Sequence, residues 1–449
     1  MPPQRAIATG KKDGTIDSPR DEAVESPTAQ KRAKYKSFKV RFVSTIAMIG
    51  SFLFMIYLGH VPLMALILFI QWCMVRELFE LARESQQDNR IPGFRAQQWY
   101  FFGAATFFFY LRFIKNNLLK EITLYAPLSR LLGWLVTSHS LISYSFYMGG
   151  LIFFVLSLKK GMYLYQFGQF AWTHMILMIV FVPSSFFISN IVQGLIWFLL
   201  PCSLIIANDI TAYLAGFFFG KTPLIKLSPK KTWEGFIGGF LGTVLLSFIF
   251  TRIMAQFSWM ICPRQDLSIG WLECEPDEIY LKSTYNISDV TNILPASFVE
   301  YLNFLSLYIP VDFREVFLRQ TITLEPMALH AAVLAVFASV ISPFGGFFAS
   351  GFKRAFKVKD FAAIIPGHGG MTDRMDCQML MAVFSYLYFF TFVQKTRMDV
   401  GSILDMAVKL DQNHQLELFG KLGNYLVGED SLPDSIRPQL QEIIQMSCR

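Results

Sequence analysis

Long apolar runs, separated by short polar segments, dominate the chain between residues 40 and 394. A helix needs about 20 apolar residues to cross the hydrocarbon of a bilayer, and most of the runs have that length. The pattern predicts an all-α, polytopic membrane protein of about nine transmembrane helices. The predicted spans are 40–58, 61–81, 98–114, 137–158, 171–189, 191–219, 235–255, 329–349 and 377–394.

The run 191–219 is too long for one straight crossing. We therefore expect it to be tilted, broken or extended past the membrane. Around the spans the sequence predicts four regions: a disordered basic tail over 1–39, a first group of transmembrane helices over 40–190, a second transmembrane region over 191–399 that includes an acidic loop at 256–328, and a small helical tail over 400–449.

The composition also indicates that lipid surrounds most of the surface of the protein. Of the 449 residues, 53% are hydrophobic, only 16% are charged and 46 are phenylalanine. A soluble domain carries about 25% charged residues. A water-soluble chain of this size would have to hide most of its apolar surface, so membrane insertion is the simpler account.

The placement of charge predicts the orientation. The net charge is +7, and residues 30–41 hold six bases and no acid directly before the first span. This run is typical of a cytoplasmic flank, and its position beside the membrane favours lipid headgroups over nucleic acid as its partner. A cytoplasmic N-terminus places the lysine-rich loops 220–234 and 350–376 on the same side.

The loop 256–328 then lies on the opposite side, as its ten acids against four bases and its Asn286 glycosylation sequon favour. Its two cysteines, Cys262 and Cys274, would pair in an oxidising compartment. One conflict remains, since nine spans put the C-terminus opposite the cytoplasm although Lys395 and Arg397 directly follow the last span.

The segment 350–376 concentrates groups that bind phosphates and metals. Glycines around His368 allow a close backbone approach and an anion cradle. Asp373 and Asp376 share one face of the helix that follows, and two adjacent carboxylates favour a cation such as Mg²⁺ between them. The alternative is a solvated charged loop in which the two aspartates only begin a helix. The segment's other charged side chains are Lys353, Arg354, Lys357, Lys359, Asp360 and Arg374.

Two further segments carry candidate chemistry. Asn208 and Asp209 lie inside an apolar run, where an ionisable side chain usually serves a site, although a structural pair with a lysine is the alternative. Lys230 and Lys231 begin the next span and would bind polyphosphate as point charges, or simply flank the membrane. The histidines at 60, 139, 174, 330 and 414 are scattered singly, and we interpret them as structural.

Together these segments resemble the phosphatidate cytidylyltransferases, in particular the eukaryotic branch of that family. The upstream pieces Asn208–Tyr213 and Ser228–Gly235 match it, as does the signature stretch near the C-terminus. That stretch stands here as Ser350, Lys353, Arg354, Lys359, Asp360, Pro366, His368, Gly369, Gly370, Asp373, Arg374 and Asp376.

The resemblance implies that CTP and phosphatidic acid react to give CDP-diacylglycerol and pyrophosphate for phospholipid synthesis. It implies Mg²⁺ held by Asp209, Asp373 and Asp376, a second, monovalent cation such as K⁺, a homodimer, and a multi-pass endoplasmic reticulum membrane protein with a cytoplasmic active site. The catalytic candidates are then Asp209, Asp360, Asp373, Asp376, Lys359 and His368. The substrate-binding candidates are Asn208, Lys230, Lys231, Ser350, Lys353, Arg354, Gly369, Gly370 and Arg374.

Two other functions are compatible with basic loops and intramembrane acids. One is another CTP-using lipid phosphotransferase, of the polyprenol kinase type. The other is an anion transporter, although the charges gather on one face and the sequence contains no visible inverted repeat. No nucleic-acid partner is expected.

Overall fold

The structure is a computed structural model. It describes residues 27–81, 93–117, 126–225, 228–264, 270–286, 321–362, 364–366, 369–394, 404, 407–408, 410–429, 435 and 438–439. The chain divides into two compact units: the first is Met1–Pro276 with His330–Ala382, and the second is Asp277–Leu329 with Val383–Arg449. Residues 1–26 of the tail predicted to be disordered, together with His368, Lys395 and Arg397, lie outside the described residues, as does the rest of the Asn286 sequon. Residues 27–39 of that tail belong to a helix instead.

Helices account for most of the described residues of the first unit, as predicted. The elements from the N-terminus to the first hairpin are α1 (Pro27–Leu58), α2 (His60–Leu81), α4 (Phe94–Asn117), α6 (Ala126–Leu156), α7 (Tyr163–Val192) and α8 (Leu195–Phe219). They are followed by β1 (Pro223–Ile225), β2 (Ser228–Thr232), α9 (Trp233–Met254) and α10 (Ser258–Ile261), and later by α14 (Pro326–Val340), α15 (Pro343–Ala355) and α16 (Thr372–Tyr388).

The second unit contains the remaining described elements and the ends of α14 and α16. Strands β3 (Ser283–Asn286) and β4 (Thr321–Leu324) pair antiparallel. The π-helix η2 (Phe389–Val393) continues α16, η1 (Glu278–Tyr280) is a single turn, and α18 (Gln412–Gly428) is the amphipathic helix predicted in the tail.

Helix α8 is continuous from Leu195 to Phe219, so the long run 191–219 is not broken in its middle, and the helix is preceded by a turn at Gly194. The φ of Gly194 is +128°, and an added Cβ would lie 2.9 Å from the carbonyl oxygen of Ile261, so only glycine suits this turn. The turn separates α7 from α8, whose first half is buried around Trp197. Most of α7 is buried too, and with α2 it forms the centre of the hydrophobic core.

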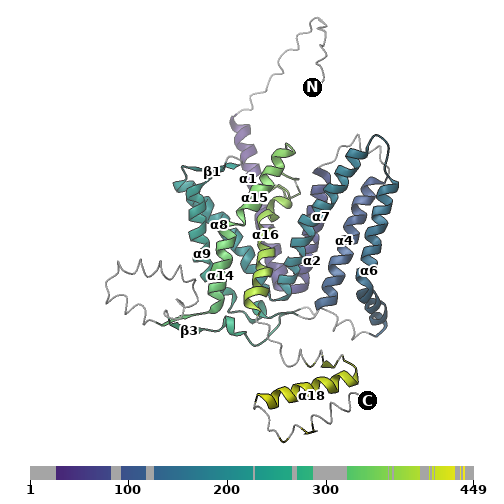
Figure 1. The fold of residues 1–449 in the computed structure, drawn as a ribbon. Coiled ribbons are helices and arrows are strands. Elements are labelled where there is room, and N and C mark those ends of the chain that lie inside the picture. Colours follow the sequence, from purple (N-terminus) through teal and green to yellow (C-terminus); the bar gives the residue numbers. More distant parts are fainter. Residues whose placement is uncertain are drawn as a thin grey trace, which may run out of the picture. The chain divides into compact units, whose positions relative to one another are not determined.

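Helices α4, α6 and α7 stand side by side, and α8 and α9 form a separate pair (Figure 1). Tyr100 of α4 donates a hydrogen bond to the carbonyl of Phe146 in α6. The absence of a side chain at Gly150 allows the ring of Phe101 to pack against α6, because a Cβ there would approach the ring to 2.8 Å.

Among the described residues, eight helical segments are long and apolar enough to cross a membrane, with α14 and α15 counting as one. Helix α4, at the predicted span 98–114, is too polar to join them, yet the contacts require it to cross. Trp271, beyond α9, donates a hydrogen bond to the carbonyl of Tyr57 at the end of α1, so both helix ends face the same side. The chain must therefore cross the membrane an even number of times between the end of α1 and the end of α9. Helices α2, α6, α7, α8 and α9 give five crossings, and α4 makes the number six.

The loop after α9 is held by a disulfide between Cys262 and Cys274, as the sequence allowed. Arg264 is buried beside it and donates a hydrogen bond to the carbonyl of Gly270. The disulfide and the β1–β2 hairpin are at opposite ends of α9. Because α9 crosses the membrane, they lie on opposite sides of it.

Candidate functional site

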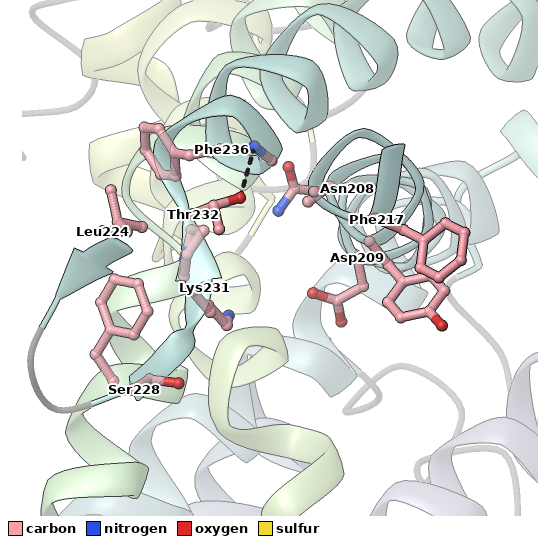
Figure 2. A pocket seen from close by; sticks show the side chains of 14 residues that line it. Asn208, Asp209, Phe217, Leu224, Ser228, Lys231, Thr232 and Phe236 are labelled. Atoms are coloured by element: carbon pink, nitrogen blue, oxygen red, sulfur yellow. Dashed lines mark hydrogen bonds between the residues drawn. The ribbon is translucent and has the colours of Figure 1, made fainter. Parts of the chain in front are cut away.

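A cavity of about 500 Å³ opens beside α8, between the β1–β2 hairpin and the start of α15. Asp209 of α8 and Lys231 of β2 extend toward the same space, and Ser228 lies at its edge (Figure 2). Asn208 and Thr232 add polar groups, and most of the remaining wall is apolar and includes Phe347 of α15. The cavity therefore combines an acid, a base and an apolar wall at one end of the helices.

Small residues on α9 set the distance between α8 and α9. Gly235, Gly238, Gly239 and Gly242 recur at helical spacing on one face. An added Cβ on Gly239 would lie 2.8 Å from the Asn208 Oδ1. This close packing is typical of membrane helices that lack a hydrophobic driving force for association. It fixes the part of α8 that carries Asn208 and Asp209.

Two side chains, those of Thr232 and Glu234, hold the hairpin against the start of α9 through hydrogen bonds. Thr232 is the N-cap, and its hydroxyl accepts a hydrogen bond from the backbone N–H of Gly235. The carboxylate of Glu234 turns back to accept hydrogen bonds from the N–H groups of Lys221 and Thr222 and from the Thr222 hydroxyl. The hairpin is therefore anchored beside the cavity that Lys231 lines.

The cavity's charges come from elements that are far apart in the sequence. Asp209 interacts electrostatically with the cationic groups of Lys231 and Arg374. The Lys231 ammonium also lies 5.0 Å from the ring centroid of Phe347, a cation–π distance. The β1–β2 hairpin, α8, α15 and α16 thus meet at one place.

Asp373, at the start of α16, is held by three donors. Its Oδ1 lies 2.5 Å from the Lys353 ammonium of α15. Its Oδ2 accepts hydrogen bonds from the backbone N–H groups of Phe361 and Gly370, at 3.1 and 3.2 Å. These contacts join α15, the loop 356–371 and α16. Both carboxylate oxygens of Asp373 therefore have partners within the protein.

Asp376 lies one helical turn further and has different surroundings. Its Oδ1 accepts a hydrogen bond from the backbone N–H of Cys377, and the carboxylate interacts electrostatically with Lys353 and Asp209. Gly345 and Gly346 of α15 make room for it, since a Cβ on Gly345 would lie 2.5 Å from the Asp376 carbonyl oxygen. Asp376 and Asp209 are thus the two neighbouring acids.

A second, largely apolar cavity of about 330 Å³ ends at Asp376 and Thr372. It lies between α2, α7, α15 and α16, with walls that include Ile176, Phe348 and Met379. Helix α15 separates it from the first cavity: Pro343 and Phe347 face the first, whereas Phe344 and Phe348 face the second.

Glu77 of α2, a buried acid at the end of an apolar run, caps α16. Its side chain is 2% exposed. Its oxygens accept hydrogen bonds from the backbone N–H groups of Met371 and Thr372, at 2.6 and 2.9 Å, and from the Thr372 hydroxyl at 2.8 Å. The sequence does not reveal this cap, because the partners of Glu77 lie almost 300 positions away.

The other predicted site residues occupy several environments. Asp360 lies beside Gly369, where an added Cβ would be 3.4 Å from both the Asp360 and Asp373 carboxylates. The Ser350 hydroxyl donates a hydrogen bond to the Gly346 carbonyl inside α15. Arg354 and Lys359 are exposed on the same segment. Lys230 belongs to β2, but its side chain, like His368, lies outside what the structure describes.

Among the described residues, no three or more His, Cys, Asp or Glu side chains are gathered as a metal site. The set Asp209, Asp373 and Asp376 is not drawn together, because Lys353 and two backbone N–H groups hold Asp373. The Asp209–Asp376 pair still offers the hard oxygen ligands that Mg²⁺ uses, and Mg²⁺ often takes only one or two carboxylates together with substrate phosphates. A magnesium site stays a prediction on this pair.

Comparisons with known proteins match most of the chain. The model of the cytidylyltransferase family matches residues 39–392. "Phosphatidate cytidylyltransferase 1" of Arabidopsis thaliana is 48% identical over 88% of this chain and 89% of its own length. "Phosphatidate cytidylyltransferase 1" of Homo sapiens is 39% identical over 90% of this chain and 82% of its own. A "putative phosphatidate cytidylyltransferase" of Schizosaccharomyces pombe is 40% identical over 88% and 85%.

Proposed function

The chain belongs to the cytidylyltransferase family, and from that premise we propose that it transfers CMP from CTP to phosphatidic acid, giving CDP-diacylglycerol and pyrophosphate. One observation carries the proposal: a polar cavity lined by Asp209 and Lys231 and an apolar cavity ending at Asp376 lie on the two sides of α15. The nucleotide needs a polar compartment and the lipid needs an apolar one, and the two compartments must meet where the phosphate groups of the substrates react.

The polar cavity suits the nucleotide. Lys231 offers a point charge to phosphate oxygens, and Arg374 adds a second cation in reach of Asp209. Phe347 and Phe236 supply apolar surface in the same wall. The apolar cavity suits an acyl chain of phosphatidic acid, with the lipid phosphate directed to the polar end that Thr372 and Asp376 line.

The reaction requires positioning and charge neutralisation more than acid–base chemistry. An oxygen of the phosphatidic acid phosphate attacks the α-phosphorus of CTP, a new P–O–P bond forms, and the bond to the bridging oxygen of the β-phosphate breaks to release pyrophosphate. The second pKa of a phosphate monoester is about 6, so the nucleophile is already ionised at neutral pH. Lys231, Lys353 and Arg374 would neutralise the charge of the triphosphate and the lipid phosphate.

Asp209 and Asp376 would hold the magnesium ion, and Asp373 would position Lys353 and the loop 356–371 through its three contacts. Bound Mg²⁺ supplies charge neutralisation on the phosphate oxygens. Asp360, Lys359 and His368 stay candidates for phosphate contacts in the same loop. The family resemblance alone supports a monovalent cation such as K⁺ and a homodimer.

We also propose an endoplasmic reticulum membrane location with the hairpin and the loop 356–371 in the cytoplasm, where CTP is present. The Cys262–Cys274 disulfide supports this orientation, because disulfides persist in the lumen and it lies at the far end of α9 from the hairpin.

The direct test uses purified, full-length protein with Mg²⁺, either phosphatidic acid or dolichol, and CTP radiolabelled at the α-phosphate or, in a parallel reaction, at the γ-phosphate, because CDP-diacylglycerol retains the first and dolichyl phosphate receives the second. We expect label in CDP-diacylglycerol, with one pyrophosphate released per lipid. Label in dolichyl phosphate alone would instead assign the chain to the CTP-dependent polyprenol kinases. Anion flux in liposomes without pyrophosphate release would point to a transporter.

A further inference from the structure

A third cavity, of about 330 Å³, lies between α4, α6 and α7. No residue of the proposed catalytic site lines it. Its walls are mostly aromatic, and its lining residues on α6 include Tyr144 and Tyr147, which are 61% and 41% exposed. Exposed side chains on a membrane-spanning helix face lipid, so the cavity is accessible from the bilayer.

Two polar atoms of residues that line this cavity have no hydrogen-bond partner in the part of the chain that the structure describes. They are the hydroxyl of Ser143 on α6 and Nε2 of His174 on α7. Ser143 is only 6% exposed. An unpaired polar atom away from water is unfavourable, because it has lost its hydrogen bonds to water without replacement. The middle of a transmembrane helix is a costly place for two such atoms, unless a ligand completes their hydrogen bonds.

The hydrogen bonding of His174 defines what that ligand must offer. Its Nδ1 lies 2.8 Å from the carbonyl oxygen of Phe170, and a carbonyl can only accept. Nδ1 therefore carries the proton, which leaves Nε2 of the neutral ring as an acceptor. The ring is fixed in place by Phe101 and Phe170, at centroid distances of 4.9 and 4.1 Å. The ligand must therefore donate a hydrogen bond to Nε2.

A neighbouring histidine shows how such an acceptor is completed. His139 of α6 also directs Nδ1 to a carbonyl, that of Val136 at 2.8 Å. Its Nε2 lies 3.2 Å from the hydroxyl of Ser140, which donates to it. The two histidines have the same tautomer, but within the described residues His139 has a hydroxyl partner for its Nε2 and His174 has none.

We propose that this cavity binds a lipid alcohol, a membrane lipid with one free hydroxyl on an apolar body. Its hydroxyl would donate to Nε2 of His174 and accept from Ser143. The aromatic walls would cover the adjoining part of the molecule, and the rest would extend into the bilayer. Diacylglycerol and sterols both have this chemistry. The site is separate from the proposed catalytic cavities and does not depend on the proposed function.

Photoactivatable sterol and photoactivatable diacylglycerol, each added to the full-length protein in liposomes, test the proposal and distinguish the two sources. We expect one of them to label peptides of α4, α6 or α7. The unlabelled parent lipid should compete, whereas its O-methyl ether, which cannot donate, should compete about three- to tenfold less well. This comparison uses the unmodified protein, so it does not depend on any variant folding.

His174→Phe and Ser143→Ala should each lower labelling by a similar factor, with CTP-dependent activity retained as evidence of folding. Ser145→Ala is the matched control, because this hydroxyl of α6 is exposed and donates within its own helix. The proposal is overturned if the methyl ether competes as well as the alcohol, if neither lipid labels these helices, or if both cavity variants label like the parent protein.

Discussion

Asp373 and Asp376 are three residues apart on α16, yet they have different partners. The sequence correctly placed them on one helix beside basic residues, because the i, i+3 spacing fixes a shared face. It did not predict that Lys353 and the N–H groups of Phe361 and Gly370 surround Asp373, since these contacts depend on the path of the loop 356–371. The prediction of Asp209 as an intramembrane site residue rests on a stronger argument, the cost of a charge at membrane depth.

Glu77 provides a test at this scale. Glu77→Ala removes three hydrogen bonds at the start of α16, and a lost cap typically costs about 0.5–2 kcal/mol. We expect a lower melting temperature and a fall in kcat of about tenfold or more, with the KM for CTP nearly unchanged, because Glu77 positions α16 without touching the nucleotide cavity.

Glu77→Gln keeps one acceptor oxygen and should recover part of both losses. The matched control is Glu80→Gln on the same helix, where the exposed acid only pairs with Arg76 and should matter little. A normal kcat in the Glu77→Ala protein would show that Glu77 does not position α16 for the reaction.

At the scale of elements, the sequence predicted the helices and the boundary near residue 190 between α7 and α8, because apolar length is a local signal. It could not predict which helices pair. The α8–α9 contact depends on glycines meeting Thr211, Ala212 and Ala215 across the interface, and a single sequence does not reveal partners. Likewise, the break between α14 and α15 lies inside a run that appeared to be one span.

Gly239→Ala tests this interface. The new methyl group would lie 2.8 Å from the Asn208 Oδ1 and 2.9 Å from the Ala212 Cβ, so α8 and α9 must separate. We expect a melting temperature several degrees lower and reduced activity, since overpacking costs about 1–3 kcal/mol.

Gly168→Ala on α7 is the control, because nothing lies within 4 Å of its added Cβ. It should be neutral or stabilising by up to about 1 kcal/mol. Equal behaviour of the two alanine variants in a thermal-shift assay would show that close α8–α9 packing is not what holds Asp209.

At the scale of the whole molecule, charge asymmetry predicted an orientation, and paired helix ends now support the crossing count. The Tyr57–Trp271 contact requires α4 to cross although its hydropathy alone does not. The hydrogen bond between Glu77 and Thr372 also requires α4 to cross, because it puts the end of α2 and the start of α16 on one side of the membrane.

Labelling in sealed microsomes tests the crossing. A cysteine introduced at Lys159, in the turn between α6 and α7, should react with a membrane-impermeant maleimide added from outside, as should one at Leu224 in β1. A cysteine at Glu273, beside the disulfide, should react only after permeabilisation. A cysteine at Glu80, near the end of α2, should also react from outside, because α4 and α6 together return the chain to the same side. If the cysteine at 159 requires permeabilisation while that at 80 does not, α4 does not cross.

The central claim is that Asp209 and Asp376 gather magnesium and both phosphate-bearing substrates, and a magnesium titration of CDP-diacylglycerol synthesis tests it most directly. Asp209→Asn and Asp376→Asn should each lower kcat by about 10²-fold or more and raise the magnesium concentration for half-maximal rate. Asp373→Asn should lower kcat with little change in that concentration, and Asp411→Asn, exposed before α18, should behave like the parent protein. Normal turnover at ordinary magnesium in either of the first two variants would contradict the account.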